Sequence, residues 1–198
     1  RITYADGTTE EKLAYAPHGY DLVVDTKAYT NASNARVGYL FDHTHRTSKR
    51  LNMPMLVGEW GAFNGMDSSY LDQTMFIAEK FENYKCGQTY WAHYQGMEKH
   101  PYFSALIRPR PMEVAGTIES FRYDPEQNRF YCAWNEDGDI QQPSTFFLPG
   151  VSNAEALDIK LIPNGGGFEM KFRDNAPGVI LSIEPSENSL LRELTITF

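Results

Sequence analysis

The sequence predicts an α/β segment over residues 1–107, built like part of a (β/α)8 TIM barrel, and an antiparallel β-sandwich over residues 108–198. Two observations support this division. Short strand patterns alternate with helical patterns in the first hundred residues, whereas apolar residues recur at every second position further on. Between these parts, Arg108-Pro109-Arg110-Pro111 cannot continue a helix, because proline lacks the backbone N–H and fixes φ.

Three strands and two helices are expected in the first part. The first strand is Leu13-Ala14-Tyr15-Ala16, stopped by Pro17; the second ends at Glu59, and the third covers residues 88–94. The first helix lies between Asn31 and Asn52, where apolar and small residues recur at helical spacing: Val37, Leu40, Phe41, Thr44 and Ser48.

The second helix is expected to start at a cap on Asp67 or Ser68 and to end before Gly87, a plausible C-cap glycine. Its apolar face carries Leu71, Thr74, Met75, Ala78 and Phe81. Three parallel strands cannot close a barrel, because closure needs about eight.

About seven short antiparallel strands are expected beyond residue 108, each with one apolar face. The alternating residues are Phe130, Cys132 and Trp134; Leu157, Ile159 and Leu161; Phe168, Met170 and Phe172; Val179, Leu181 and Ile183; and Leu194, Ile196 and Phe198. Turn residues separate these runs at 124–125, 136–139, 164–167 and 176–178.

Composition excludes some classes of function. A hydrophobic content of 41% indicates a packed protein, and the net charge of -8 disfavours nucleic acid and anionic membranes as partners. No apolar run reaches the roughly 18 residues of a transmembrane segment. Cys86 and Cys132 either pair with each other or remain two buried thiols. No signal peptide precedes Arg1, so we expect the chain to begin inside a longer polypeptide.

Chemically suggestive side chains follow the three predicted strands. His18 and Tyr20 follow the first, Glu59 and Trp60 end the second, and Trp91, His93 and Tyr94 end the third. Parallel strands of a barrel end on one face, so these groups are expected to meet over one cavity. A carboxylate there can attack an anomeric carbon, and a tyrosine hydroxyl can hold it ionised and aimed. A tryptophan face can pack against a sugar ring.

Three motifs resemble the last three barrel strands of glycoside hydrolase family 5. They are Tyr15-Ala16-Pro17-His18-Gly19-Tyr20, Val57-Gly58-Glu59-Trp60-Gly61 and Tyr90-Trp91. The resemblance makes the first part strands six to eight of the barrel. It implies that Glu59 is the nucleophile of a retaining mechanism, that His18 and Tyr20 support it, and that Trp91 is the sugar platform.

Within the family, the chain is most similar to the endoglycoceramidase-related group, whose sandwich is entered through a segment like residues 108–117. One departure is large. Family members carry a general acid/base glutamate after an asparagine at the end of strand four, and nothing here matches it, although Glu10, Glu11 and Asp21 are available acids. We therefore expect the isolated chain to be inactive, since general acid catalysis contributes roughly 10² to 10⁴ in rate.

Several features keep a simpler interpretation beside the functional one. Trp60 either lines the cleft or packs in the core. His93 and Tyr94 are candidates for contacts with the substrate beyond the cleaved bond, and the sequence favours neither outcome. A metal site at His43 and His45 is disfavoured, because helical residues two apart face different directions. Residues 136–139 are more typical of a hairpin turn than of a calcium loop. A lipid substrate would need an apolar groove beside the cleft. The residues that either line such a groove or simply pack their loops are Phe63, Met66, Tyr70, Tyr102 and Phe103.

The sequence thus predicts the C-terminal portion of a retaining β-glycosidase that acts on a β-glycoside, with a glycolipid as one candidate. It needs no cofactor or metal, because two carboxylates and water suffice. The alternative is a non-catalytic carbohydrate-binding or scaffolding protein. Open barrel strands leave an unpaired edge, so we also expect association with a missing N-terminal half, which could be a separate chain, or self-association. Hydrolases of polymers and glycolipids are usually exported, which favours a secreted or extracytoplasmic location.

Overall fold

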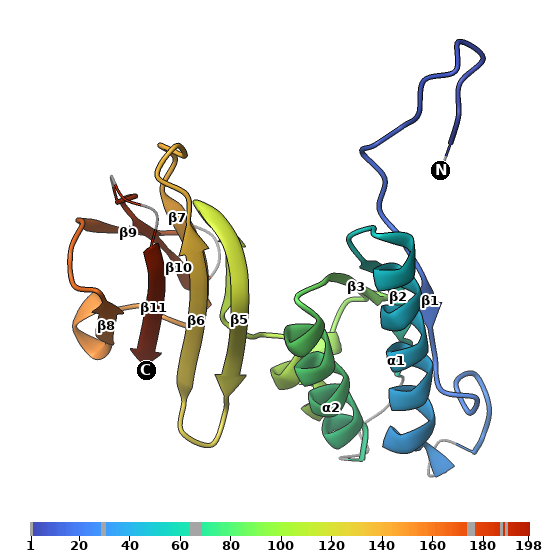
Figure 1. The fold of residues 1–198 in the computed structure, drawn as a ribbon. Helices are drawn as coiled ribbons and strands as arrows, with labels where there is room; N and C mark the ends of the chain where they lie inside the picture. The colour runs from blue at the N-terminus through green and yellow to red at the C-terminus, as the bar shows by residue number, and fades with distance from the viewer. Residues whose placement is uncertain (1, 29–30, 64–68, 174–176, 187, 189) are drawn as a thin grey trace. The chain divides into compact units, whose positions relative to one another are not determined.

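The structure, a computed structural model, describes residues 2–28, 31–63, 69–173, 177–186, 188 and 190–198. The chain forms two compact units, Arg1–Ala105 and Leu106–Phe198, each with its own secondary structure (Figure 1). The first is a parallel βαβαβ segment and the second consists of two antiparallel sheets. This arrangement confirms the predicted fold class.

The sheet of the first unit has the order β1-β2-β3, with β1 at His18–Gly19, β2 at Leu56–Gly61 and β3 at Gly87–Trp91. Both pairs of neighbouring strands are parallel. The connections are the helices α1 (Asn34–Leu51) and α2 (Ser69–Tyr84) (Figure 1). The register sets His18 beside Glu59 and Gly61 beside Trp91, so the parallel pairing itself aligns the residues of interest.

The predicted position of the first strand is wrong. Within the run 13–16 only Tyr15 pairs with the sheet, in a single bridge to Met55, and the strand proper follows Pro17. Pro17 does not stop the pairing, because its carbonyl accepts a hydrogen bond from the Gly58 amide at 2.9 Å. Proline is tolerated at a sheet edge, where its missing N–H is not needed. The pairing therefore continues past Pro17 and carries His18 to Glu59.

Helix α1 has the predicted buried face, and it starts after Ser33. The Ser33 hydroxyl accepts a hydrogen bond from the Arg36 amide at 3.3 Å, which caps the first turn. Val37, Phe41 and Ser48 are buried, and the helix ends at Leu51, followed by the C-cap Asn52 in the left-handed region.

Helix α2 buries a face centred on Thr74, Ile77 and Phe81. The caps predicted at Asp67 and Ser68 lie outside the described residues. The C-cap predicted at Gly87 is wrong, because Lys85 adopts the left-handed conformation (φ 55°) and Gly87 is already the first residue of β3. A Cβ on Gly87 would lie 2.9 Å from a Leu56 methyl, so close packing of the strands is the better reason for this glycine.

Strand β3 ends at Trp91, three residues earlier than predicted, so His93 and Tyr94 lie in the following segment. Two short 3₁₀ helices, η2 (Met97–Lys99) and η3 (Pro101–Ala105), complete the first unit.

The second unit is the predicted β-sandwich, with eight strands in its described part. One sheet has the order β4-β7-β10-β9 and the other β5-β6-β11-β8. The strands are β4 (Arg110–Glu113), β5 (Gly116–Asp124), β6 (Arg129–Glu136), β7 (Ser144–Pro149), β8 (Asp158–Ile162), β9 (Phe168–Phe172), β10 (Gly178–Ile183) and β11 (Leu190–Thr197), with a short 3₁₀ helix η4 (Ala154–Ala156). Phe130, Trp134, Phe146, Leu181 and Leu194 are central to the core between the sheets.

Strand β9 departs from the predicted burial. Phe168 and Phe172 are 58% and 43% exposed, although they alternate with polar residues as core residues do. Their strand is the edge of its sheet, so only Met170 packs against the core. The sequence pattern gave the correct face of the strand, but it carried no information on how far the partner sheet extends.

The turn at residues 136–139 is not a hairpin, because it joins β6 and β7, which belong to different sheets. Glu136 is buried, and its Oε2 lies 2.9 Å from Nη1 of the buried Arg192 on β11. Arg192 Nη2 also donates to the Gly165 carbonyl at 2.9 Å, and the Ser186 amide donates to Glu136. This buried ion pair has no local signature in the sequence, because its two members are 56 positions apart in the chain.

Both cysteines are free thiols. Burial raises the pKa of Cys86 and of Cys132 to about 12, so both are protonated at neutral pH. The pairing left open by the sequence is therefore not formed. No helix within the described ranges is long and apolar enough to span a membrane.

Candidate active site

Glu59 stands on β2, the middle strand of the parallel sheet. Its side chain is 29% exposed, so it is reachable by a ligand while its neighbours limit its motion. The residues before and after it differ sharply in size. Gly58 gives room to His18, since a Cβ there would lie 2.9 Å from the His18 Nε2, and Trp60 points into the core. β2 thus presents Glu59 on one side and anchors itself on the other.

Tyr20 and His18 both contact the Glu59 carboxylate. The Tyr20 hydroxyl donates a hydrogen bond of 2.7 Å to Oε2, and the His18 Nδ1 lies 3.2 Å from the same oxygen. Burial, then the hydrogen bond to Glu59, raises the pKa of Tyr20 well above its usual value. The phenol therefore remains a donor over the whole neutral range. Among the described residues, these contacts reach Oε2 and leave Oε1 for another partner.

Trp91 is the exposed aromatic residue of this sheet. It is 53% exposed at the end of β3, opposite Gly61 on β2. Its carbonyl accepts a hydrogen bond of 2.7 Å from Ala62, and its peptide bond to Ala92 is cis. Gly61 must be glycine, because it has φ 93° and a Cβ would lie 2.2 Å from the Tyr90 ring. The predicted platform residue is thus held against β2 with its ring open to solvent.

Trp60 does not line the site. It is fully buried, its Nε1 donates to Gln88 Oε1 at 2.5 Å, and its ring packs edge-on against Phe81 and Tyr90. The prediction that Trp60 touches substrate is therefore wrong. The physical reason is the alternation of side chains along a strand, which sends Glu59 and Trp60 to opposite faces of the sheet.

The aromatic residues proposed for an apolar groove are mostly interior. Phe63, Tyr70 and Tyr102 are buried and pack against one another or against Tyr90, so they stabilise the unit. Phe103 is half-buried, and Met66 lies outside the described residues. The packing interpretation is the correct one for the three buried rings.

His93 is exposed, whereas Tyr94 is half-buried and joined by a 2.7 Å hydrogen bond to the Tyr102 hydroxyl. A substrate contact stays a prediction for both. His43 is exposed as expected, but His45 stacks on Tyr84 at 4.3 Å. Three side chains able to hold a metal ion are not brought together anywhere in the described part of the chain.

Asp21 was considered an available acid from the sequence, and that is wrong. Its side chain is only 1% exposed and forms an ion pair of 2.9 Å with Arg36. Burial alone would raise the pKa of Asp21, but hydrogen bonds from Arg36, Ser33 and Val23 outweigh burial and hold the pKa below its usual value. Asp21 is therefore an ionised structural anion beside the site, and neither a proton donor nor a solvent-exposed acid.

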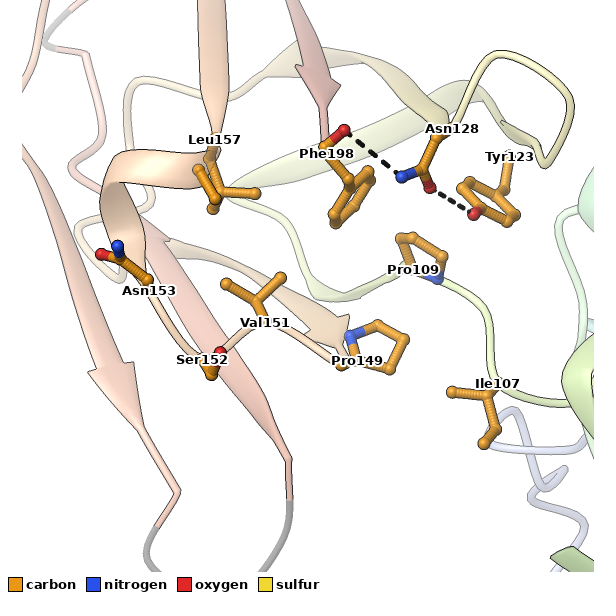
Figure 2. A pocket seen from close by; sticks show the side chains of 12 residues that line it. Ile107, Pro109, Tyr123, Asn128, Pro149, Val151, Ser152, Asn153, Leu157 and Phe198 are labelled. Carbon is orange, nitrogen blue, oxygen red and sulfur yellow. Dashed lines mark hydrogen bonds between the residues drawn. The ribbon is translucent and has the colours of Figure 1, made fainter.

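A separate cavity of about 370 Å³ lies within the second unit (Figure 2). Its lining includes the rings of Tyr123, Pro109, Pro149 and Phe198 together with Asn128. Figure 2 shows Asn128 between two of these groups: its amide nitrogen donates to the Phe198 carbonyl at 3.3 Å and its oxygen accepts from the Tyr123 hydroxyl at 2.7 Å. The cavity is thus aromatic and apolar with a polar rim.

The described fold is thus a parallel βαβαβ segment, in which Tyr20 and His18 contact the carboxylate of Glu59, followed by a β-sandwich. Residues 108–195 match the profile of the glycoside hydrolase family 5 C-terminal domain. The sandwich is thus the part of the chain that matches this domain, and the fold of the whole chain matches that of the C-terminal part of a family 5 enzyme.

Solved structures agree on the fold. Endo-glycoceramidase II from Rhodococcus sp. in its ganglioside GM3 complex is 19% identical, with a TM-score of 0.68 over 96% of this chain and 43% of that one. Sterylglucosidase 1 of Cryptococcus neoformans is 12% identical, with a TM-score of 0.63 over 93% of this chain and 37% of that one. The chain therefore spans less than half the length of these enzymes. No curated protein matches the sequence.

Proposed function

We propose that the chain is the nucleophile-bearing portion of a retaining β-glycosidase. The observation that carries the proposal is the convergence of Tyr20 and His18 on one oxygen of Glu59, with the exposed Trp91 at the end of the neighbouring strand β3. A hydrogen bond to one carboxylate oxygen fixes the orientation of the group and so aims the other oxygen. The second oxygen, Oε1, is the one that would attack the anomeric carbon.

The reaction has two steps. Oε1 of Glu59 forms a bond to the anomeric carbon while the glycosidic oxygen departs and takes a proton from a second carboxylic acid. Water then attacks the same carbon, gives its proton to that second carboxylate and displaces Glu59. The released sugar keeps the configuration of its anomeric carbon. The second acid should lie about 5 Å from Glu59, and we propose that it comes from the remainder of the barrel rather than from this chain.

A glycolipid is the substrate class that the structural relatives support. They include an endo-glycoceramidase in complex with ganglioside GM3 and a sterylglucosidase, and a further structure of the former is a lactosyl-enzyme intermediate. Within the first unit, Trp91 would supply the apolar face on which a sugar ring stacks. His93, which is exposed just beyond β3, would contact the substrate further from the cleaved bond.

Covalent trapping tests the proposal. A 2-deoxy-2-fluoro β-glycoside with a dinitrophenolate leaving group needs no general acid, because dinitrophenolate departs without a proton. The complete enzyme should gain the mass of one fluorosugar, and peptide mapping should find the sugar on Glu59. The same labelling should fail for Glu59→Gln and persist for Glu79→Gln, an exposed glutamate on α2. Labelling on a different carboxylate would refute the assignment of Glu59.

Carbohydrate binding by the sandwich is a second candidate function, favoured by the cavity beside Tyr123. Aromatic rings and amide groups are the usual lining of sugar sites. If this is the function, cellobiose should bind in a calorimetric titration, and Tyr123→Ala should weaken binding at least about tenfold, the loss expected for one aromatic contact. Tyr39→Ala, which removes an exposed tyrosine on α1, is the control and should leave binding unchanged. Absence of heat for both the original protein and the variants would exclude this function.

A further inference from the structure

The residue directly after Tyr20 is a buried anion that fastens the segment carrying the tyrosine. We propose that Asp21 is a positioning residue, which holds the Tyr20 hydroxyl against Glu59 and so supports the nucleophile without touching substrate. The catalytic consequence rests on the function proposed for Glu59, whereas the positioning itself does not.

Asp21 accepts hydrogen bonds from four residues. Its Oδ1 accepts from the Arg36 guanidinium at 2.9 Å and the Val23 amide at 3.2 Å. Its Oδ2 accepts from the Ser33 amide at 2.8 Å and the Gln73 side chain at 3.4 Å. These donors belong to the β1–α1 connection, the start of α1 and the first turns of α2. One carboxylate thus ties the connection to both helices.

Tyr20 lies between two fixed points. Before it, Gly19 is paired with Trp60 in the parallel sheet. After it, Asp21 is held by its buried carboxylate. The backbone of Tyr20 therefore has little freedom, and only its side-chain torsions remain to bring the hydroxyl within 2.7 Å of Glu59. A displacement of about 1 Å at such a donor costs catalysis strongly, because the geometry must already be correct when charge moves.

Stability of the helix pair does not explain why a charge is buried at this position. Phe41 and Phe81 already pack across α1 and α2 with their ring centroids 4.9 Å apart, and Lys80 bonds to Asp42 at 2.9 Å. A buried carboxylate is costly unless fully hydrogen-bonded, and its advantage is that it specifies one geometry. The geometry that Asp21 specifies is the conformation of the connection next to Tyr20.

Asp21→Asn tests the proposal, because asparagine keeps the size but puts an NH2 group where an acceptor is needed. In the complete enzyme, kcat should fall roughly 10-fold or more, as for loss of a hydrogen bond to a charged group, with KM changed less than about 3-fold. In a Tyr20→Phe background the same substitution should change kcat less than about 2-fold, because Asp21 acts through the Tyr20 hydroxyl and phenylalanine has none. An equal loss in both backgrounds would overturn the proposal.

A spectroscopic measurement separates this proposal from the function of Glu59. The NMR signal of the Tyr20 Cζ carbon, assigned with Tyr20→Phe, should move in Asp21→Asn and stay in place in Asp42→Asn, which breaks the ion pair between Asp42 on α1 and Lys80 on α2. In the described part of the chain, His18 contacts Glu59 and the charge of Asp25 acts on Tyr20, so all spectra are compared at one pH. If the signal moves but no trapping occurs, the proposed function fails and the positioning stands.

A second variant covers the case in which Asp21→Asn does not fold. Arg36 is 43% exposed, so Arg36→Gln removes one partner of Asp21 at the surface and is expected to fold. It should move the Tyr20 signal in the same direction by a smaller amount. An unmoved signal in this variant, at full folding, would contradict the inference.

Discussion

Replacing Glu59 with glutamine should lower glycoside hydrolysis by about 10³-fold or more, which corresponds to ~4 kcal/mol of transition-state stabilisation. The amide is similar in size and can still accept from Tyr20, so the fold should persist while the nucleophile is lost. The measurement is kcat/KM on an aryl β-glycoside in the complete enzyme, with Glu79→Gln as the matched surface variant.

Chemical rescue makes the result specific to a nucleophile. In Glu59→Ala, a small anion such as azide can occupy the vacated space and attack the anomeric carbon of a substrate with a good leaving group. The product should be the α-glycosyl azide, because azide attacks from the face that Glu59 occupied. Retention of more than about a tenth of the original activity in Glu59→Gln would show that another group performs the attack.

Removing one partner of the buried pair Glu136–Arg192 should unfold the sandwich at a much lower temperature. In Glu136→Gln the Arg192 charge remains buried without its counter-ion, which costs about 3–5 kcal/mol. For a domain of this size each kcal/mol lowers Tm by roughly 4–8 °C, so a fall of more than about 12 °C is expected. Calorimetry of the purified protein measures it, and Glu169→Gln on the exposed edge of β9 is the control.

The reverse experiment distinguishes an unpaired charge from lost packing. Glu136→Leu combined with Arg192→Met removes both charges and keeps much of the volume, so the double variant should recover most of the Tm. The Arg192 side chain also lies over the Trp134 ring at 5.7 Å, a contact that methionine can partly replace. A double variant as unstable as Glu136→Gln alone would mean that shape, and not charge, dominates this part of the core.

Local patterns were sufficient for the fold class and for the residues at the strand ends. The helical spacing of Val37 and Phe41, and the alternation of Val179, Leu181 and Ile183, correspond directly to buried faces. The strand next to Pro17 was misplaced, because whether proline ends a strand depends on which edge its missing N–H faces.

Contacts between distant segments could not be predicted from local sequence patterns. Asp21 meets Gln73 across 52 positions and Glu136 meets Arg192 across 56, and neither pair has a local signature. Trp60 was uncertain for a different reason: a tryptophan beside a strand-end glutamate fits a cleft and a core equally well until the direction of the strand faces is known. Tyr20 and His18, in contrast, were predicted because they follow the first expected strand in a motif that resembles family 5, and the parallel register does place His18 beside Glu59.

The two protonated thiols give each unit its own reporter of opening. Cys86 belongs to the unit that carries Glu59, and Cys132 lies in the core of the sandwich. A thiol-directed reagent should modify either one slowly until its surroundings open, since the reactive thiolate is rare at both and Cys132 is also buried. The rates of labelling at the two sites, read separately by mass spectrometry, would therefore show whether the barrel strands and the sandwich unfold as one cooperative body or as two.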